Sequence, residues 1–195
     1  MDIERPKSKQ PIPAHAKLVF KGQIFDVYQW EQKMFDGTTE VFEKLKRPDT
    51  VVVYPVFPDG RIILTEQEQP GKEPFLGATG GRVDEGEGIL EAAKRELLEE
   101  SGYAADKFIL WDAQQPIGKI DWAIYTFIAK GLKKVADIHL DAGEKITLTP
   151  VTFDEFLEMG TNERFVEKAV KGTLREAVLN PEKKAELRQL FSPEY

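Results

Sequence analysis

The segment GRVDEGEGILEAAKRELLEESGY, residues 81–103 of a chain of 195, carries more information about the fold than any other part of the sequence. Within it, apolar residues recur at Leu90, Ala93 and Leu97, at spacings of three and four, which predicts an amphipathic helix. Gly102 stands where a glycine commonly ends a helix, because glycine adopts the left-handed conformation at little cost. We therefore expect a helix that begins near residue 90 and ends at Gly102.

Three glutamates, Glu96, Glu99 and Glu100, share one arc of this helix, at the border of its apolar face. Carboxylates crowded in this way repel one another, so one of them holds a proton unless a cation compensates their charge. Oxygen ligands with no Cys or His nearby favour a hard divalent cation, Mg²⁺ or Mn²⁺, over zinc. The alternative is a solvated acidic helix face, in which Arg95 pairs with Glu91 and Glu99.

The composition is that of an ordinary globular protein, with 41% hydrophobic and 31% charged residues. The net charge of −7 does not attract nucleic acid or an anionic membrane, so we expect neither as a partner. The chain has no Cys, which excludes disulfides and thiolate metal sites. No apolar run approaches the ~20 residues of a membrane span, and the first 15 residues lack the core of a signal peptide. We expect a cytoplasmic protein.

Isolated residues outside the segment give weaker signals. Arg47, Arg61 and Lys119 could contact phosphate, although lone basic residues in or beside loops are most often solvated. The two histidines, His15 and His139, are expected to be ordinary surface or strand residues.

The rest of the chain predicts strands before and after one acidic helix, followed by terminal helices. Residues 1–14, with three prolines, are expected to form an extended or mobile arm, and Asp36-Gly37 predicts a hairpin in a strand lobe. The aromatic residues of this lobe exceed what one hairpin buries; most are expected in a core, and one or two against a base or a dimer partner. The further strands are expected at 50–57, 61–66, 108–111, 122–129 and 146–149, and the helices at 153–159, 163–178 and 181–190. Residues 67–77 are expected to be a loop. This order is typical of an α+β fold.

Two turns are expected before the acidic helix, Thr79-Gly80-Gly81 and the acidic residues 84–87. With them, the segment resembles the Nudix box, G-x5-E-x7-R-E-U-x-E-E-x-G-U, in which U is a bulky aliphatic residue. Only Tyr103, at the last position, departs from this pattern. The eight matching residues are Gly81, Glu87, Arg95, Glu96, Leu97, Glu99, Glu100 and Gly102.

The chain from about Phe20 to Val178 also resembles the ADP-ribose pyrophosphatase branch of this family. The resemblance implies an α/β/α sandwich with a mixed sheet between helices. It implies an N-terminal antiparallel strand lobe at 15–47, which builds a homodimer and contacts the nucleoside, and a hydrolase domain at 48–195. The chain departs from the pattern of this branch at two places that bear on the substrate. Residues 67–69 (QEQ) lack an arginine that members of the branch often have there, and residues 77–79 (GAT) stand where members commonly have Glu-Leu-Pro.

The same resemblance implies the chemistry and the roles of the residues. The expected reaction is hydrolysis of the pyrophosphate bond of a nucleoside diphosphate sugar such as ADP-ribose, giving a nucleoside monophosphate and a sugar phosphate. Dinucleoside polyphosphates, NADH and nucleoside triphosphates are the alternative substrates. A non-catalytic nucleotide-binding module is less expected, because no glutamate of the box is missing.

The metal ligands implied for Mg²⁺, or alternatively Mn²⁺, are Glu96, Glu99, Glu100 and the carbonyl of Gly80. The residues that orient or shape the site are Gly81, Glu87, Arg95 and Gly102. The catalytic residues are Glu99, Glu100 and Glu144. Glu144 is either a fourth ligand or the base that activates water, with an exposed loop glutamate as the alternative and Asp141 as a weaker candidate for the base. No other residue is assigned to substrate binding.

Overall fold

The computed structural model describes residues 3–140 and 142–194. The strands are β1 (Lys17–Lys21), β2 (Asp26–Lys33), β3 (Thr39–Lys46), β4 (Thr50–Pro55), β5 (Ile62–Gln69), β6 (Lys72–Gly77), β7 (Thr79–Arg82), β8 (Tyr103–Gln114), β9 (Ile120–Asp121), β10 (Ile124–Lys134) and β11 (Lys145–Val151). The helices are α1 (Ile89–Ser101), α2 (Phe153–Glu158), α3 (Lys168–Leu179) and α4 (Pro181–Leu190). In the described part of the chain, no helix is both long and apolar enough to cross a membrane.

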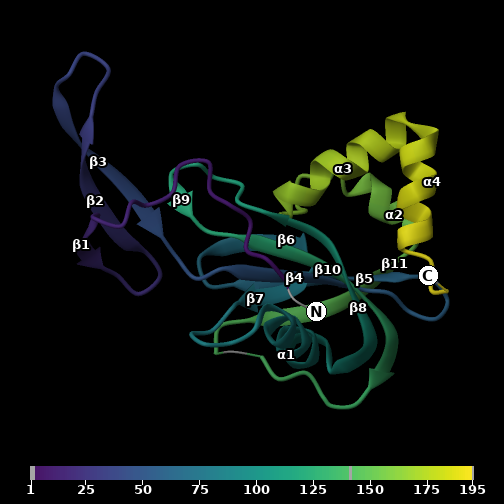
Figure 1. Cartoon of the computed structure of the whole chain (residues 1–195). Coiled ribbons are helices and arrows are strands. Elements are labelled where there is room, and N and C mark those ends of the chain that lie inside the picture. Colours follow the sequence, from purple (N-terminus) through teal and green to yellow (C-terminus); the bar gives the residue numbers. More distant parts are fainter. Residues whose placement is uncertain (1–2, 141, 195) are drawn as a thin grey trace.

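The strands form three sheets, ordered β1-β2-β3-β9, β7-β4-β10-β8 and β11-β5-β6. In the central sheet β4 pairs antiparallel with β7 and parallel with β10, so the sheet is mixed. Helix α1 covers one face of the strands, and α2, α3 and α4 gather on the other (Figure 1). The expected layers, with strands between helices, are therefore present.

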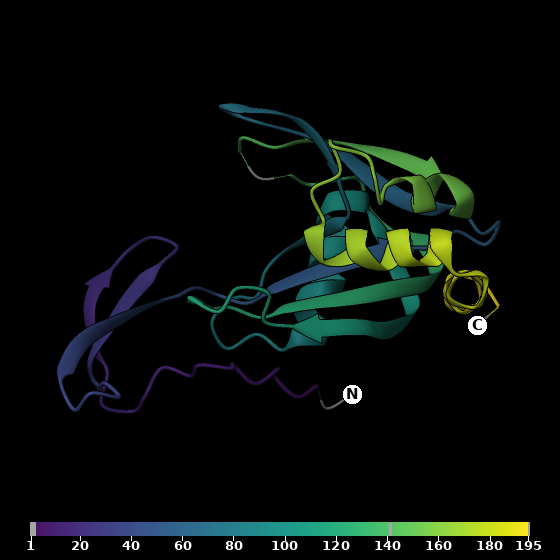
Figure 2. The same cartoon turned by 90° about the horizontal axis from the view of Figure 1, so that it is seen from above.

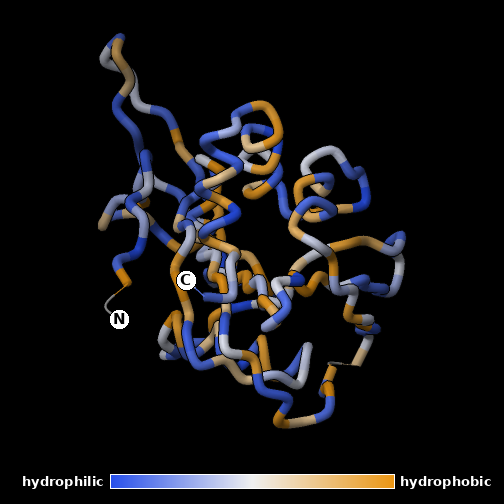
Figure 3. Tube along the Cα trace, turned by 90° about the vertical axis from the view of Figure 1, so that its right-hand side faces the viewer, coloured by the Kyte–Doolittle hydropathy of each residue, from blue (hydrophilic) through white to orange (hydrophobic). Residues whose placement is uncertain are grey.

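Strand β4 separates two apolar cores. Val51 and Val53 pack with the buried face of α1, whereas Val52 and Tyr54 pack with residues of α2, α3 and α4. Successive side chains of a strand point to opposite faces, so a strand covered on both faces needs an apolar residue at every position. This explains the unbroken apolar run in the sequence. Hydrophobic stretches, orange in Figure 3, run through the middle of the molecule, and others lie on its outer loops.

Helix α1 follows the sequence prediction closely. Ala92, Ala93 and Leu97 are fully buried on its inner face, and the helix ends at Gly102, whose φ is +70°. The N–H of Gly102 donates to the Leu98 carbonyl, and its own carbonyl accepts from the N–H groups of residues 135 and 136 after β10. A side chain at this position would collide with the carbonyl of Ala136. Gly102 therefore ends the helix and also joins it to the central sheet.

Two expectations near the box were wrong. Thr79-Gly80-Gly81 is part of strand β7 and not a tight turn, because Gly80 pairs with Val52 of β4. A side chain on Gly80 would collide with the carbonyl of Val51, so only glycine permits this approach. Residues 67–77 are not a loop either: β5 continues to Gln69, and β6 pairs with it as a hairpin. Prolines and glycines there suggested a loop, although they only form the turn and one edge of the hairpin.

The aromatic residues of the strand lobe are mostly not in a core, contrary to expectation. Of the lobe's aromatic side chains only Trp30 is buried, whereas Phe20 and Phe35 are exposed. The lobe itself forms as predicted: Asp36 accepts hydrogen bonds from the N–H and hydroxyl of Thr38 in the β2–β3 turn. The lobe projects from the body, and the N-terminal arm runs back from it toward the central sheet (Figure 2).

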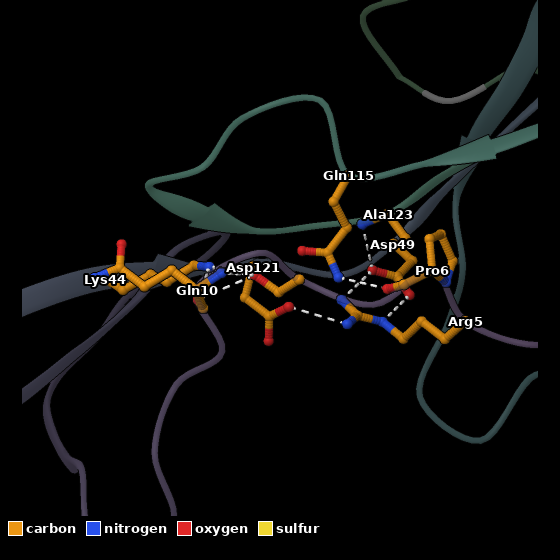
Figure 4. Close-up of polar contacts among 9 residues, drawn as sticks. Arg5, Pro6, Gln10, Lys44, Asp49, Gln115, Asp121 and Ala123 are labelled. Carbon is orange, nitrogen blue, oxygen red and sulfur yellow. Dashed lines mark hydrogen bonds and ion pairs between the residues drawn. The ribbon is translucent and has the colours of Figure 1, made fainter.

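The arm is extended, and polar side chains attach it to the body (Figure 4). The Arg5 guanidinium pairs with Asp49 at 2.8 Å and with Asp121 at 3.0 Å. Farther along the arm, the ammonium of Lys44 in β3 donates to the Ser8 hydroxyl and, at 2.6 Å, to the Gln10 carbonyl. Lys44 is almost fully buried by these contacts. The arm thus connects the lobe to the body, and its mobility in solution stays a prediction.

We expect Arg5→Ala to lower the free energy of unfolding by about 1–2 kcal/mol, because it leaves two mostly buried carboxylates, Asp49 and Asp121, without their cation. Urea denaturation measures the change. The control is Arg61→Ala, which removes an ion pair with Asp59 in an exposed turn and is expected to change nothing measurable. Equal stability of the Arg5 variant and the wild type would show that the arm does not support the fold.

Candidate active site

The predicted site residues converge on one cavity of about 450 Å³ between α1, β7 and the loop before β11. It is lined by Gly80, Gly81, Arg82, Asp84, Arg95, Glu96, Glu99, Glu100, His139 and Glu144. Most of the residues implied by the box therefore meet here. The other three do not line it: Glu87 is held by Arg95, Leu97 is buried in the core, and Gly102 ends the helix.

Arg95 is the cation around which the carboxylates are arranged. Its Nε and Nη2 atoms each donate at 2.9 Å to one oxygen of Glu87, which is a bidentate pair. Its Nη1 donates to Glu96 at 2.8 Å and to Glu99 at 3.1 Å. These hydrogen bonds lower the pKa of Glu87 below its ordinary value. Of the alternative pairing of Arg95 with Glu91 and Glu99, the ion pair with Glu99 is present, whereas Glu91 pairs with Lys94.

Glu100 is the most buried carboxylate of the group, with 6% of its surface exposed. It accepts a hydrogen bond of 2.8 Å from the N–H of Gly80. Burial raises the pKa of Glu100 to about 8 against this hydrogen bond, and the negative charges of Glu96, Glu144 and Glu167 raise it further. Burial also raises the pKa of Glu96, against the opposing effect of Arg95. The repulsion expected from the sequence is thus present in the folded protein.

The glycines of β7 provide the space for these carboxylates. A side chain on Gly81 would collide with the carboxylate of Glu96, so the strand and the helix come together only with glycine there. Gly80 contributes its N–H to Glu100, which the sequence did not reveal. The role of the Gly80 carbonyl as a metal ligand stays a prediction.

Glu144 comes to the site from a distant part of the chain. It lies in the loop that precedes β11, and its charge acts on both Glu96 and Glu100. The exposed loop glutamate that was the alternative is therefore not the arrangement found, since Glu144 is partly buried in the cavity. Asp141, the weaker candidate for the base, lies outside the described residues.

Sequence reasoning missed Arg82, Asp84 and His139 as residues of the cavity. His139 is brought there by its backbone N–H, which donates at 2.8 Å to the carbonyl of Glu99 near the end of α1. This bond also fixes the segment between β10 and β11 against the helix. No pattern near His139 signals the approach, because the partner is 40 residues earlier in the chain.

The donor set fits a hard divalent cation in its chemistry, because it consists of carboxylate oxygens with a large negative charge. Among residues 3–140 and 142–194, however, no three His, Cys, Asp or Glu side chains are arranged as a ready-made metal cage. The carboxylates are instead engaged by Arg95 and by the N–H of Gly80. The residues can supply the ligands, and Arg95 supplies the compensating charge in this arrangement.

A second cavity, of about 710 Å³, adjoins the first and shares Gly80 with it. Its walls come from β4, β5, β6, β7, the start of α3 and the loop between β8 and β10. Arg47 lies on this wall, with its guanidinium 4.5 Å from the ring centre of Trp122. Of the isolated basic residues in the sequence, Arg47 is thus close to the site, whereas Arg61 pairs with Asp59 in an exposed turn.

Similar known proteins identify the family of this chain. The NUDIX domain family matches residues 46–171, which is more than half of the chain. ADP-ribose pyrophosphatase of Bacillus subtilis (strain 168) is 28% identical over 144 residues, which cover 72% of this chain and 78% of that protein. The methanol dehydrogenase activator of Bacillus methanolicus is 29% identical over 144 residues, covering 72% of this chain and 77% of its own. The chain belongs to the Nudix family.

Two further relatives concern ADP compounds. ADP compounds hydrolase NudE of Escherichia coli (strain K12) is 30% identical over 101 residues, which are 50% of this chain and 54% of that protein. A crystal structure of an ADP compounds hydrolase superposes with a TM-score of 0.69 at 21% identity, covering 89% of this chain and 92% of that one. This likeness confirms the expected fold. The expected enzyme class, a Nudix pyrophosphohydrolase, agrees with the names of these relatives.

Without divalent metal, we expect stability to fall as the pH rises from about 4.5 to 8. Over this range folded Glu100 keeps a proton that the unfolded chain releases, because its pKa is raised to about 8, so raising the pH favours unfolding. For one proton, the free energy of unfolding falls by at most about 1.4 kcal/mol per pH unit. Urea denaturation in EDTA at several pH values measures it.

Glu100→Gln removes this titration and should flatten the dependence on pH, whereas Glu91→Gln, at an exposed position of the same helix, should leave it unchanged. The same slope in the wild type and both variants would contradict the assignment.

Proposed function

We propose that this chain is a metal-dependent Nudix hydrolase of a nucleoside diphosphate sugar such as ADP-ribose. The products would be a nucleoside monophosphate and a sugar phosphate, and the metal Mg²⁺, with Mn²⁺ as an alternative. The observation that carries the proposal is the cavity in which all three box glutamates of α1 meet Glu144. The names of the relatives, ADP-ribose pyrophosphatase and ADP compounds hydrolase, support the substrate class.

The carboxylates of α1 would hold the metal in this proposal. When bound, the metal supplies positive charge that neutralises the phosphoryl oxygens and makes water more acidic. Glu96, Glu99 and Glu100 are the ligands that α1 presents. Burial disfavours the charged form of Glu100, and the hydrogen bond from Gly80 offsets this only in part, so a bound cation would compensate the charge. Positioning and electrostatics then account for most of the rate, as in other phosphoryl transfers.

The other residues of the cavity position these groups and move a proton. Arg95, fixed by its bidentate pair with Glu87, holds Glu96 and Glu99 at a defined orientation, which is a positioning role. Glu144 is our candidate for the base that accepts the proton of the attacking water, because it lines the cavity from the loop before β11 and does not belong to α1. Glu99 and Glu100 remain the alternatives for this step.

We propose a homodimer assembled through the strand lobe. Exposed apolar side chains gather on it to an extent that is unusual for a free surface. They are Leu18, Val19, Phe20, Ile24, Phe25, Phe35 and Val41. A second copy of the chain would cover them, as the family resemblance implies. A cytoplasmic location stays a prediction of the sequence.

Glu99→Gln is expected to lower kcat/KM for ADP-ribose in Mg²⁺ by at least about 100-fold while the melting temperature and circular dichroism stay unchanged. The reason is that the variant removes a charged ligand at a position whose side chain is 43% exposed and supports no core packing. Product analysis by chromatography, with ADP-ribose, ADP-glucose, GDP-mannose, UDP-glucose, a diadenosine polyphosphate and NADH, measures activity. Glu91→Gln on the same helix is the control and should retain full activity.

Release of a nucleoside monophosphate and a sugar phosphate by the wild type from one of the first four substrates would support the proposal and name the sugar. Cleavage of only the polyphosphate or NADH would contradict the substrate class and leave the hydrolase chemistry in place. A folded wild-type protein that cleaves none of them would refute the proposal.

Combined Phe20→Asp and Val41→Asp substitutions are expected to convert a dimer into a monomer, because charges on both exposed positions oppose burial against a second copy. Light scattering after size exclusion measures the mass. Leu179→Asp, at an exposed apolar residue of α3 outside the lobe, is the control and should stay dimeric. A monomeric wild type, or a double variant that stays dimeric, would exclude this interface.

A further inference from the structure

The cavity of about 710 Å³ contains a carboxylate that the proposed reaction does not use. Glu167, the residue immediately before α3, lines this cavity together with Gln67, Phe75 and Trp122. Its carboxylate is near enough to the catalytic group that its charge raises the pKa of Glu100. A substrate that reaches from the first cavity past Gly80 into the second would therefore meet Glu167.

The position of the Glu167 carboxylate depends on a glycine in β6. Gly77 has no side chain, and a Cβ placed there would stand 3.3 Å from Oε1 of Glu167. The backbone of Ala78 donates a hydrogen bond to the carboxylate, and burial raises the pKa of Glu167. The carboxylate of Glu167 thus lies against β6, although the residue itself lies far along the chain, just before α3.

The groups around Glu167 are both polar and aromatic. Gln67 is buried beside Gly77, with its Nε2 donating to the hydroxyl of Thr65. The rings of Phe75 and Trp122 also line the cavity, where Lys72 and Arg47 contact them, and Lys168 is a further basic residue of the lining. A carboxylate accepts hydrogen bonds from hydroxyl groups, and adjacent hydroxyls can both donate to it, whereas it repels a phosphate. Within the described residues, the buried Nε of Arg47 on the same wall has no hydrogen-bond partner.

We propose that Glu167 is a specificity-determining residue whose carboxylate accepts hydrogen bonds from the adjacent hydroxyls of a ribose of the substrate. This inference rests on the proposed function, because it takes the substrate to be a nucleoside diphosphate joined to a sugar. ADP-ribose contains two such riboses, one in each product. The chemistry at Glu167 is the same for both, and binding of the separate products distinguishes them.

The test compares the products with their deoxy analogues in calorimetric titrations, which need no turnover. The pairs are AMP with 2′-deoxy-AMP, and ribose 5-phosphate with 2-deoxyribose 5-phosphate. In the wild type, one deoxy compound should bind about tenfold or more weakly than its parent, because it lacks one donor to the carboxylate. In Glu167→Ala this difference should disappear for that pair. The pair that responds shows which ribose Glu167 contacts.

Glu167→Gln keeps the shape of the side chain and an acceptor for the N–H of Ala78, so it replaces the alanine variant if that variant unfolds. It should weaken binding of the parent compound and reduce the difference in affinity between the parent and deoxy compounds. Glu176→Ala, at an exposed position of α3, is the matched control and should behave as the wild type. With ADP-ribose as substrate, Glu167→Ala should raise KM about tenfold and change kcat much less. A purely structural role would lower melting temperature and affect all four compounds equally.

The inference is overturned if the deoxy difference is the same in the wild type and the Glu167 variants, or if the wild type binds neither parent compound. Its failure is distinct from failure of the proposed function, because the titrations do not depend on hydrolysis. A wild type that binds ribose 5-phosphate or AMP through Glu167 but does not cleave ADP-ribose would refute only the proposed reaction.

Discussion

The close approach of β7 to both β4 and α1 is the constraint on which the rest of the site depends. Two successive glycines permit it: a side chain on Gly80 would collide with the backbone of Val51, and one on Gly81 with the carboxylate of Glu96. Because the strand lies so near the helix, the N–H of Gly80 reaches Glu100, and Gly81 lies against the carboxylate of Glu96. The packing of one strand thus fixes the geometry of the carboxylates.

The same packing creates an electrostatic conflict that the chain resolves only in part. Arg95 compensates Glu87, Glu96 and Glu99, whereas Glu100 is buried with one backbone hydrogen bond and a raised pKa. A group that is costly to ionise in the folded protein is one that gains most from a cation. Sites that bind a charged ligand commonly contain a residue of this kind, which lowers the stability of the fold when the ligand is absent.

The surroundings of the carboxylates connect the site to the whole molecule. Gly80 lines both the cavity of the carboxylates and the larger one, so the two cavities adjoin at this residue. Asp49 and Asp121, which hold Arg5 of the arm, directly precede Thr50 and Trp122, two residues that line the larger cavity. The arm is therefore fastened beside this cavity, while the apolar residues of the lobe stay exposed.

The sequence by itself determined the elements whose signals are local. The spacing of Leu90, Ala93 and Leu97 gave α1, Gly102 gave its end, and the box placed three glutamates on one arc. The tertiary structure alone decided where distant segments meet. It made residues 79–82 a strand by pairing them with β4, left the lobe aromatics exposed, and brought Glu144, His139 and Glu167 to the cavities. Helical periodicity and helix ends depend on neighbours within a few residues. Strand pairing and the packing of loops against other elements depend on residues far away in the sequence, which no local pattern identifies.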